Sequence, residues 1–180
     1  MSDTTAAPAA RRRNLMIGLG LGAAIAAFSV VASGGVDSVG RIAASARPHA
    51  PDLALLAAQP PAIQLHLVSV AIAFVVGAVL LLGPKGTLPH RTLGWTWAIA
   101  MGTVAVSSLF IREINEGGFS FVHAISGWVI VALPAALYAA RRHKVAAHRG
   151  AMTGMYFGGM FLAGGLAFLP GRLMWRLFFG

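Results

Sequence analysis

The chain contains no cysteine and only five acidic residues among its 180 residues. The absence of cysteine excludes disulfides, iron–sulfur clusters, thiolate metal sites and haem attached through cysteine. No acidic residue lies between Asp52 and Glu113 or after Glu116. This gap argues against a carboxylate di-iron centre, and it leaves no buried carboxylate to orient a histidine in a hydrolase triad. Redox chemistry in this protein would therefore require a bound cofactor.

Charged residues of either sign are also scarce, at 11% of the chain, while hydrophobic residues make up 57%. A soluble domain usually carries about a quarter charged residues. A helix needs about 20 mostly apolar residues to span a bilayer, and five runs qualify. We expect transmembrane helices over Asn14–Ser33, Ile63–Gly83, Thr92–Ile111, Phe119–Ala140 and Gly150–Leu169. The composition therefore predicts an all-α integral membrane protein with five transmembrane helices.

The net charge of +9 is better explained by membrane topology than by nucleic-acid binding. Basic residues concentrate on alternate loops, as the positive-inside rule describes for cytoplasmic segments. One set of segments carries nine of them: Arg11, Arg12, Arg13, Lys85, Arg91, Arg141, Arg142, Lys144 and Arg149. The other set carries five: Arg41, Arg47, Arg112, Arg172 and Arg176. We therefore expect a cytoplasmic N-terminus, an external C-terminus, and the lipid bilayer rather than nucleic acid as the partner.

Polar and irregular segments divide the chain. Residues 1–13 are small and polar and predict a disordered cytoplasmic tail. The apolar run over residues 14–33 exceeds the roughly 7–15 residues of a typical signal-peptide core, so we expect an uncleaved anchor helix. Residues 34–62 contain paired glycines and several prolines, which favours an external loop with one short helix over Asp52–Ala58. Residues 170–180 open with proline and glycine, which end the last span, and predict a short interfacial helix.

The chain between the loop and the tail contains an internal repeat. Its first unit opens with LHLVS at Leu65–Ser69, and its second opens with VHAIS at Val122–Ser126. Both read apolar residue, histidine, two apolar residues and serine. In each unit a second histidine follows the first after 24 or 25 residues, and arginine comes directly after it. The unit is therefore a helix, a short basic loop and a second helix, and the two units cover residues 63–111 and 119–169.

A repeat of two helices keeps its orientation in the membrane, so an axis along the membrane normal should relate the two units. We expect the last four helices, residues 63–169, to form a pseudo-two-fold four-helix bundle. The axis makes His66 equivalent to His123 near the external face, and His90 equivalent to His148 near the cytoplasmic face. The pairs would stand about 25 Å apart, at roughly 1.5 Å of rise per residue, which is too far for one site.

A lone histidine near a membrane interface is usually an amphipathic residue with its polar tip in water. We interpret His49 and His143, which lie in loops, in this way. Ionisable residues inside a membrane are costly and are functional candidates by default. The symmetric pairing of the other four histidines therefore favours one ligand-binding site for each pair.

A b-type haem is the ligand that best matches each pair, because two neutral imidazoles give a six-coordinate iron suited to electron transfer. Gly94 and Gly127 each follow a histidine by four residues, one turn along the same helix face, which leaves room for a flat macrocycle. Arg91 and Arg149 would neutralise the propionates of the inner haem. The sequence thus predicts two haem b groups, with these metal ligands: His66, His123, His90 and His148. Zinc or copper is a weaker match, because two histidines fill half of a tetrahedral site.

Three stretches, GPKGTLPHRTLGW, GGFSFVHAISG and AAHRGAMTGMYFGGM, resemble a bacterial integral-membrane family of unknown function, domain of unknown function family 2306. The resemblance covers roughly residues 60–175 and implies a compact helical bundle in the bacterial plasma (inner) membrane, with no established activity. Separately, the layout of the four histidines is similar to that of two-haem transmembrane b-type cytochromes, in which one haem lies near each membrane face.

Two functions remain open from the sequence. The first is a di-haem b-type cytochrome that carries electrons across the membrane between a quinol or external donor and an acceptor, with a quinone or another redox protein as its partner. The second is a non-enzymatic membrane subunit or small-molecule carrier, which would use the paired histidines to bind a ligand or a partner. The two classes differ in one simple property, because only the first contains haem.

Overall fold

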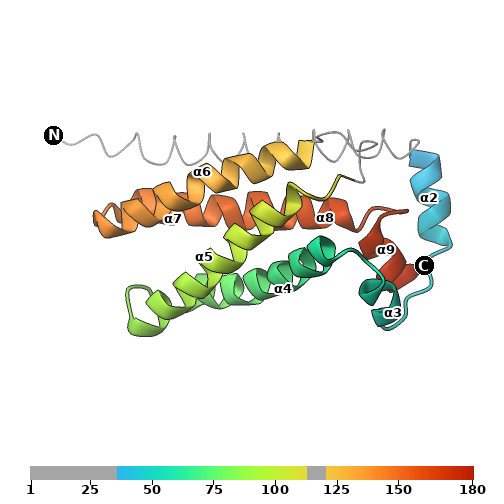
Figure 1. Cartoon of the computed structure of the whole chain (residues 1–180), viewed down its shortest axis with the longest axis horizontal. Helices are drawn as coiled ribbons and strands as arrows, with labels where there is room; N and C mark the ends of the chain where they lie inside the picture. Colours follow the sequence, from blue (N-terminus) through green and yellow to red (C-terminus); the bar gives the residue numbers. More distant parts are fainter. Residues whose placement is uncertain (1–35, 113–120) are drawn as a thin grey trace. The chain divides into compact units, whose positions relative to one another are not determined.

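In a computed structural model of the protein, residues 36–112 and 121–180 are described, and every regular element within these ranges is a helix (Figure 1). The all-α prediction is therefore confirmed for this part of the chain. The predicted tail over residues 1–13 and the predicted anchor helix over residues 14–33 lie outside the described residues. The chain divides into two compact units, of which one holds residues 52–164 and the other holds the described residues on either side.

Helices α4 (Pro61–Leu82) and α5 (Leu88–Ser108) form the first predicted helical pair. A proline opens α4 at a position where its missing N–H costs nothing. The last turn of α4 is closed by Lys85, whose Nζ donates at 2.7–2.8 Å to three carbonyl oxygens, those of Leu80, Leu81 and Gly83. Lys85, in the short connection between the two helices, thus satisfies carbonyl groups at the end of α4.

Helix α5 begins one turn before its predicted start at Thr92. Thr87 caps the helix, because its Oγ1 accepts a hydrogen bond from the backbone N–H of His90 at 3.3 Å. Pro89 is also compatible with a first turn, since its fixed φ is pre-set for a helix. His90 and Arg91 therefore lie inside the first turn of α5 and not ahead of it.

The second helical pair consists of α6 (Phe121–Arg141) and three consecutive segments, namely α7 (Val145–Gly154), the π-helix η1 (Met155–Leu162) and α8 (Ala163–Ala167). The prediction of a single α-helix over Gly150–Leu169 is wrong in two respects. The helical segment begins earlier, at Val145, and its middle part is a π-helix. The chain turns at His143, whose φ is +56°, and α7 begins soon after. His148 and Arg149 consequently lie within α7, and the wider π-helical turns follow directly.

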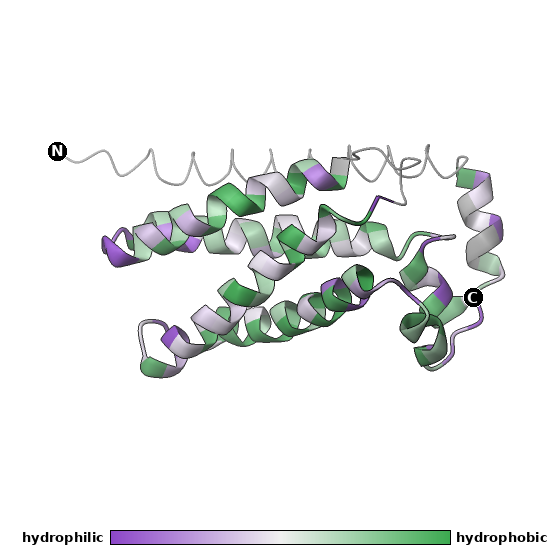
Figure 2. Cartoon of the chain, viewed as in Figure 1, coloured by the Kyte–Doolittle hydropathy of each residue, from purple (hydrophilic) through white to green (hydrophobic). Residues whose placement is uncertain are grey.

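These helices close a ring. Helix α4 packs against α5, α5 against α6, α6 against α7 and η1, and η1 against α4. The centre of the ring is filled by large side chains from α5, α6 and η1 that face small ones, and its buried members include Ala73, Trp97, Met101, Val129, Leu133, Met155 and Tyr156. Figure 2 shows hydrophobic residues along most of α4 and a hydrophilic patch at the turn between α6 and α7.

The outer surface of the ring is apolar as well. Val75 is 61% exposed, Ile99 67% and Val131 72%, although such contiguous apolar surface is unfavourable in water. Two of the described helices, α4 and residues 122–141, are long and apolar enough to cross a bilayer. The exposed apolar side chains on both are those expected of a surface that faces lipid.

The segment over residues 34–62, predicted as a loop with one short helix, contains two helices. The predicted short helix is α3 (Leu53–Ala57), and Asp52 Oδ1 caps it by accepting a hydrogen bond from Leu55 N at 2.9 Å. The unpredicted one is α2 (Val36–Ala44). It places an acidic residue in its first turn and Arg41 in its last turn, which favours a helix through its dipole.

The predicted C-terminal helix is α9 (Leu173–Phe179), and it is confirmed. It follows Gly171, whose φ of +85° lies in the left-handed region that favours glycine. The end of α9 pairs with the segment after α2, because Arg47 N donates to Phe179 O at 3.1 Å and His49 N donates to Phe178 O at 3.0 Å. His49 thus contributes to packing within its own unit.

Helix α4 is packed tightly against its neighbours at the buried Gly77. A Cβ atom at this position would lie 2.3 Å from a ring carbon of Tyr156 and 2.8 Å from Trp97 Nε1. The position of Tyr156 is fixed by a hydrogen bond to the same helix, because its hydroxyl donates to Phe74 O at 3.1 Å. Helix α4 therefore needs glycine where η1 and α5 both meet it.

We expect Gly77→Ala to destabilise the protein by about 1–3 kcal/mol, the usual cost of overpacking a filled core. Gly150→Ala is the matched control, since a Cβ there meets nothing within 4 Å and alanine favours the helix. Thermal unfolding of the purified variants in detergent measures both effects. Equal unfolding midpoints for the two variants would contradict the close packing at Gly77.

Candidate functional site

His66 lies near the start of α4 and is hydrogen-bonded across to the end of α5. Its Nδ1 lies 3.2 Å from Val104 O and 3.1 Å from Ser107 Oγ. A carbonyl oxygen can only accept, and the Ser107 hydroxyl already donates to Thr103 O at 2.6 Å. The proton must therefore sit on Nδ1, and the lone pair of the neutral ring is on Nε2.

His123, the predicted partner of His66, is buried near the start of α6, at 7% exposure. One turn later, Ser126 Oγ hydrogen-bonds with Ser108 Oγ of α5. Ser107 and Ser108 are consecutive, so α5 contacts His66 through one serine and the helix of His123 through the other. The two outer histidines thus lie on helices that flank the same end of α5, at opposite positions in the ring.

At the other end of the ring, His148 of α7 is hydrogen-bonded to α6. Its Nδ1 lies 3.0 Å from Ala136 O, which again can only accept. The Nδ1–H tautomer is therefore fixed in His148 as it is in His66, and Nε2 carries the lone pair. One histidine of each predicted pair shares this arrangement.

His90, the predicted partner of His148, is half-buried in the first turn of α5, outside the predicted span over residues 92–111. Burial lowers the pKa of His90, and the positive charge of His148 when it is protonated and that of Lys85 lower it further. The two inner histidines are thus close enough to influence each other electrostatically. The neutral form of His90, which is the form that binds metals, is favoured by this environment.

The other predicted site residues lie at the surface of the ring. Arg91 and Arg149 are exposed, each directly after a histidine of the inner pair. Gly94 and Gly127 are half-buried, and a Cβ on either would meet nothing within 4 Å. Both glycines therefore have open space next to them, in contrast to Gly77.

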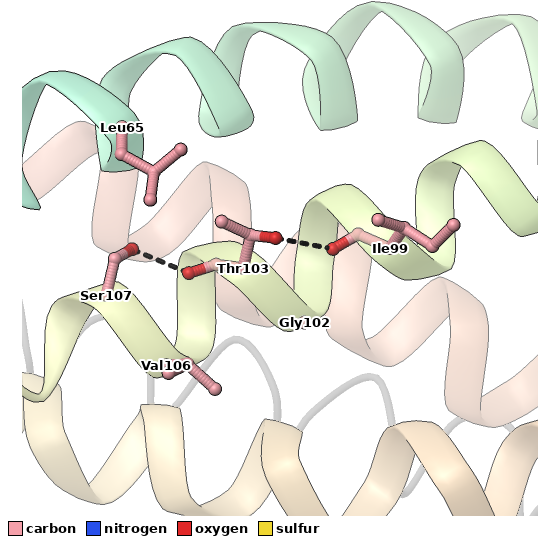
Figure 3. A pocket seen from close by; sticks show the side chains of 6 residues that line it. All are labelled: Leu65, Ile99, Gly102, Thr103, Val106 and Ser107. Carbon is pink, nitrogen blue, oxygen red and sulfur yellow. Dashed lines mark hydrogen bonds between the residues drawn. The ribbon is translucent and has the colours of Figure 1, made fainter.

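A groove lies along the face of α5 that Leu65 of α4 approaches (Figure 3). It has a volume of about 400 Å³ and is lined by Leu65, Ile99, Gly102, Thr103, Val106 and Ser107. In the close-up, the hydroxyls of Thr103 and Ser107 point back to carbonyls of their own helix, and Leu65 approaches from α4. The groove shares Ser107 with the hydrogen-bond partners of His66.

Three polar residues near the histidines are absent from the sequence prediction, namely Ser107, Ser108 and Thr103. The doublet Ser107-Ser108 was the available signal, because two consecutive hydroxyls near the end of an apolar run must find partners on different helix faces. The spacing of Thr103, four residues before Ser107, places both on one face. Serines at such positions usually bond their own helix. The contacts of Ser107 with His66 and of Ser108 with Ser126 were therefore not predicted.

The apolar helices, the buried polar links and the exposed apolar outer surface together define a membrane protein. The chain belongs to a family described as predicted membrane protein (DUF2306), whose sequence profile matches residues 63–177. The predicted family resemblance is thereby confirmed. Comparisons with curated proteins and with solved structures find no match.

We expect nitrogen NMR of histidine-labelled protein at neutral pH to show two imidazoles with a protonated Nδ1 and an unprotonated Nε2. The carbonyls of Val104 and Ala136 impose this tautomer on His66 and His148. The variants His66→Asn and His148→Asn should each remove one of these signals and so assign them. A protonated Nε2 in either residue would contradict the hydrogen bonds described above.

Acidification should destabilise the protein through His90. Its pKa in the fold lies below the usual 6.5, so the unfolded chain binds the proton more tightly. Stability is therefore highest above pH 6.5 and falls as the pH drops from there toward the folded-state pKa. Unfolding midpoints of haem-free protein across about pH 5–8 should show a smaller loss in His90→Gln than in the wild type.

The control for this experiment is His143→Asn, in the exposed turn between α6 and α7. Asparagine tolerates the positive φ at this position, so the turn should keep its shape. If His143→Asn reduced the acid sensitivity as much as His90→Gln did, the burial of His90 would not be its cause.

Proposed function

We propose that the protein is a multi-pass membrane protein that binds two b-type haems and carries electrons across the bilayer. Its last four predicted spans would form a pseudo-two-fold bundle, with one haem held by His66 and His123 and the other by His90 and His148. The N-terminus would be cytoplasmic and the C-terminus external, in a bacterial inner membrane. When bound, a six-coordinate haem supplies reversible one-electron transfer.

The observation that carries this proposal is the contact of Nδ1 of His66 and of His148 with a backbone carbonyl oxygen of a neighbouring helix. Metal-bound histidines in proteins usually donate their other ring N–H to a carbonyl or carboxylate, which orients the ring and raises its basicity. Both residues donate from Nδ1 to a carbonyl of the neighbouring helix, at 3.2 and 3.0 Å. Each therefore presents an oriented Nε2 lone pair, and one residue of each proposed pair does so.

The surroundings of the histidines also suit a macrocycle better than a bare metal ion. Among the described residues, no three potential metal-ligating side chains come together. A haem needs only two protein ligands, because its own nitrogens fill the equatorial positions. Gly94 and Gly127 leave open space one turn from His90 and His123, and the exposed Arg91 and Arg149 are suited to bind propionates beside the inner pair.

The filled middle of the ring favours two sites over one. Met101 and Met155 are almost completely buried there, at 2% and 0% exposure. His66 is hydrogen-bonded to Val104 and Ser107 near the end of α5, whereas His148 is hydrogen-bonded to Ala136 in the second half of α6. A ligand at either end would thus be separated from the other by packed apolar side chains.

The test uses asparagine in place of each linked histidine. In His66→Asn and His148→Asn the side-chain amide can still donate as Nδ1 does, while the metal-binding Nε2 is removed. The wild type should bind about two haems, each asparagine variant about one, and the combined variant close to none, because a pair acts as one site. Haem content and reduced-minus-oxidised spectra measure this directly.

The control His143→Asn should keep both haems, and unfolding midpoints of all variants should stay near that of the wild type. The matching alanine variants should lose the interhelical hydrogen bond as well, at about 1 kcal/mol each. A folded, colourless wild-type protein would refute the proposal and favour a non-enzymatic subunit or carrier. Unchanged haem content in the asparagine variants would refute the assigned ligands.

A further inference from the structure

Two consecutive arginines at the end of α6 are each held against an aromatic ring. The Cζ atom of Arg141 lies 6.0 Å from the ring centre of Trp95 on α5. The Cζ atom of Arg142 lies 5.2 Å from the ring centre of Tyr138, and Arg142 Nε donates to the hydroxyl of the same tyrosine at 2.9 Å. A cation over an aromatic face is attracted by the negative potential of the ring. Both guanidinium groups are thus oriented before any ligand binds.

The positive charges at this end of the ring have no carboxylate to pair with in the same helices. Arg141 and Arg142 are exposed, as are Lys144 in the following turn and Arg149 of α7. No acidic residue occurs in α4, α5, α6, α7, η1 or α8, or in the turns that join α4 to α5 and α6 to α7. A guanidinium stacked on a ring keeps N–H donors at its edge, and these suit two oxygens of one phosphate. This end of the ring therefore attracts anions.

The two rings under the arginines continue into apolar surface. Trp95 and Tyr138 are 51% and 57% exposed. Ile99 follows Trp95 by one turn of α5, and Val131 precedes Tyr138 by two turns of α6, so each lies on the same helix face as the corresponding ring. Both aliphatic side chains are more exposed than the rings. A ligand that contacts the arginines and these faces together must have an anionic head and an apolar body.

We propose that the end of α6 binds an anionic phospholipid, with the headgroup phosphate on Arg141 and Arg142 and the acyl chains along α5 and α6. A soluble anion would make no use of the apolar faces. A zwitterionic lipid carries an ammonium group beside its phosphate, and the neighbouring bases would repel that group because no carboxylate of these helices is there to receive it. The site therefore discriminates between headgroups, whereas a bilayer of any composition would cover the apolar helices alike.

This inference goes beyond the proposed function and shares with it only the placement of the helices in a membrane. Neither Arg141 nor Arg142 belongs to the proposed haem sites, for which Arg91 and Arg149 are the propionate partners. Arg91 lies one turn before Trp95 on the same face of α5, so it adds positive charge near the site without being assigned to the phosphate. Lipid binding and haem content can therefore be measured independently of each other.

The test titrates the protein in detergent with phosphatidylglycerol or with phosphatidylcholine of the same acyl chains, and native mass spectrometry counts the bound lipids. The wild type should bind phosphatidylglycerol about tenfold more tightly than phosphatidylcholine. Arg141→Gln and Arg142→Gln should each weaken the binding of phosphatidylglycerol about tenfold, the effect of one hydrogen bond between charged groups. Both positions are exposed, so the unfolding midpoints of these variants should stay near that of the wild type.

Two further variants keep the net charge and separate a built site from diffuse attraction. Arg141→Lys loses the planar fork of the guanidinium, and Trp95→Leu loses the ring beneath it. Each should weaken the binding of phosphatidylglycerol about three- to fivefold. Trp128→Leu is the matched control, because Trp128 lies on α6 and is 47% exposed, while Arg141 and Arg142 stack on other rings. This variant should bind the lipid as the wild type does.

Equal binding of the two lipids would overturn the proposal. Unchanged binding in Arg141→Lys and Trp95→Leu would overturn it as well, because the preference would then be diffuse attraction between charges. Displacement of phosphatidylglycerol by an excess of inorganic phosphate would assign the arginines to a soluble phosphate compound instead. Headgroup preference with these variant effects in a colourless protein would sustain the lipid site and reject the haems, whereas haem-loaded protein without headgroup preference would do the reverse.

Discussion

Polar groups in this apolar ring have few partners other than the next helix, and this constraint shapes the structure. Each neighbouring pair of the described helices in the ring shares a polar link. His66 of α4 donates to α5, Ser108 of α5 meets Ser126 of α6, His148 of α7 donates to α6, and Tyr156 of η1 donates to α4. In a low-polarity setting these hydrogen bonds have no competitor in water, so they fix which helix lies next to which.

Because an imidazole has two nitrogens, His66 and His148 can each link two helices and also bind a ligand. Nδ1 links two helices, and the same bond orients Nε2 for a ligand. A packing role alone would be served equally well by asparagine, which is why that substitution separates the two uses. Tyr156 provides the contrast, since its single hydroxyl is spent on Phe74 O and its ring fills the core. It has no second polar atom to offer.

Much of the fold follows from the sequence, because runs of apolar residues bounded by proline, glycine and basic residues define α4, α5 and α6 closely. The π-helix η1 does not follow from it. Its register depends on how Tyr156 reaches Gly77 and Phe74 of another helix, and periodicity within one segment carries no information on that contact. Helix α2 was missed because the paired glycines and the prolines of residues 34–62 favour a loop, while the charges near the two ends of α2 favour a helix. Spacing made the four histidines candidates, but the contact of His66 with Ser107 depends on the packing of α4 against α5 and could not be predicted from spacing.

The two repeat units have matching histidines and serines near their ends, but their residues differ in the middle. This difference bears on function. Ser69 and Ser126, the serines of the two His-x-x-Ser motifs, are equally buried, at 6% exposure each. Eleven residues after the first histidine of each unit, however, stand Gly77 and Pro134. Gly77 is buried against Tyr156 and Trp97, whereas Pro134 is exposed. Four helices thus pack against each other here without symmetric side chains at their centre. Packing alone therefore does not require the matched histidines at the ends, whereas a pair of similar ligand sites does.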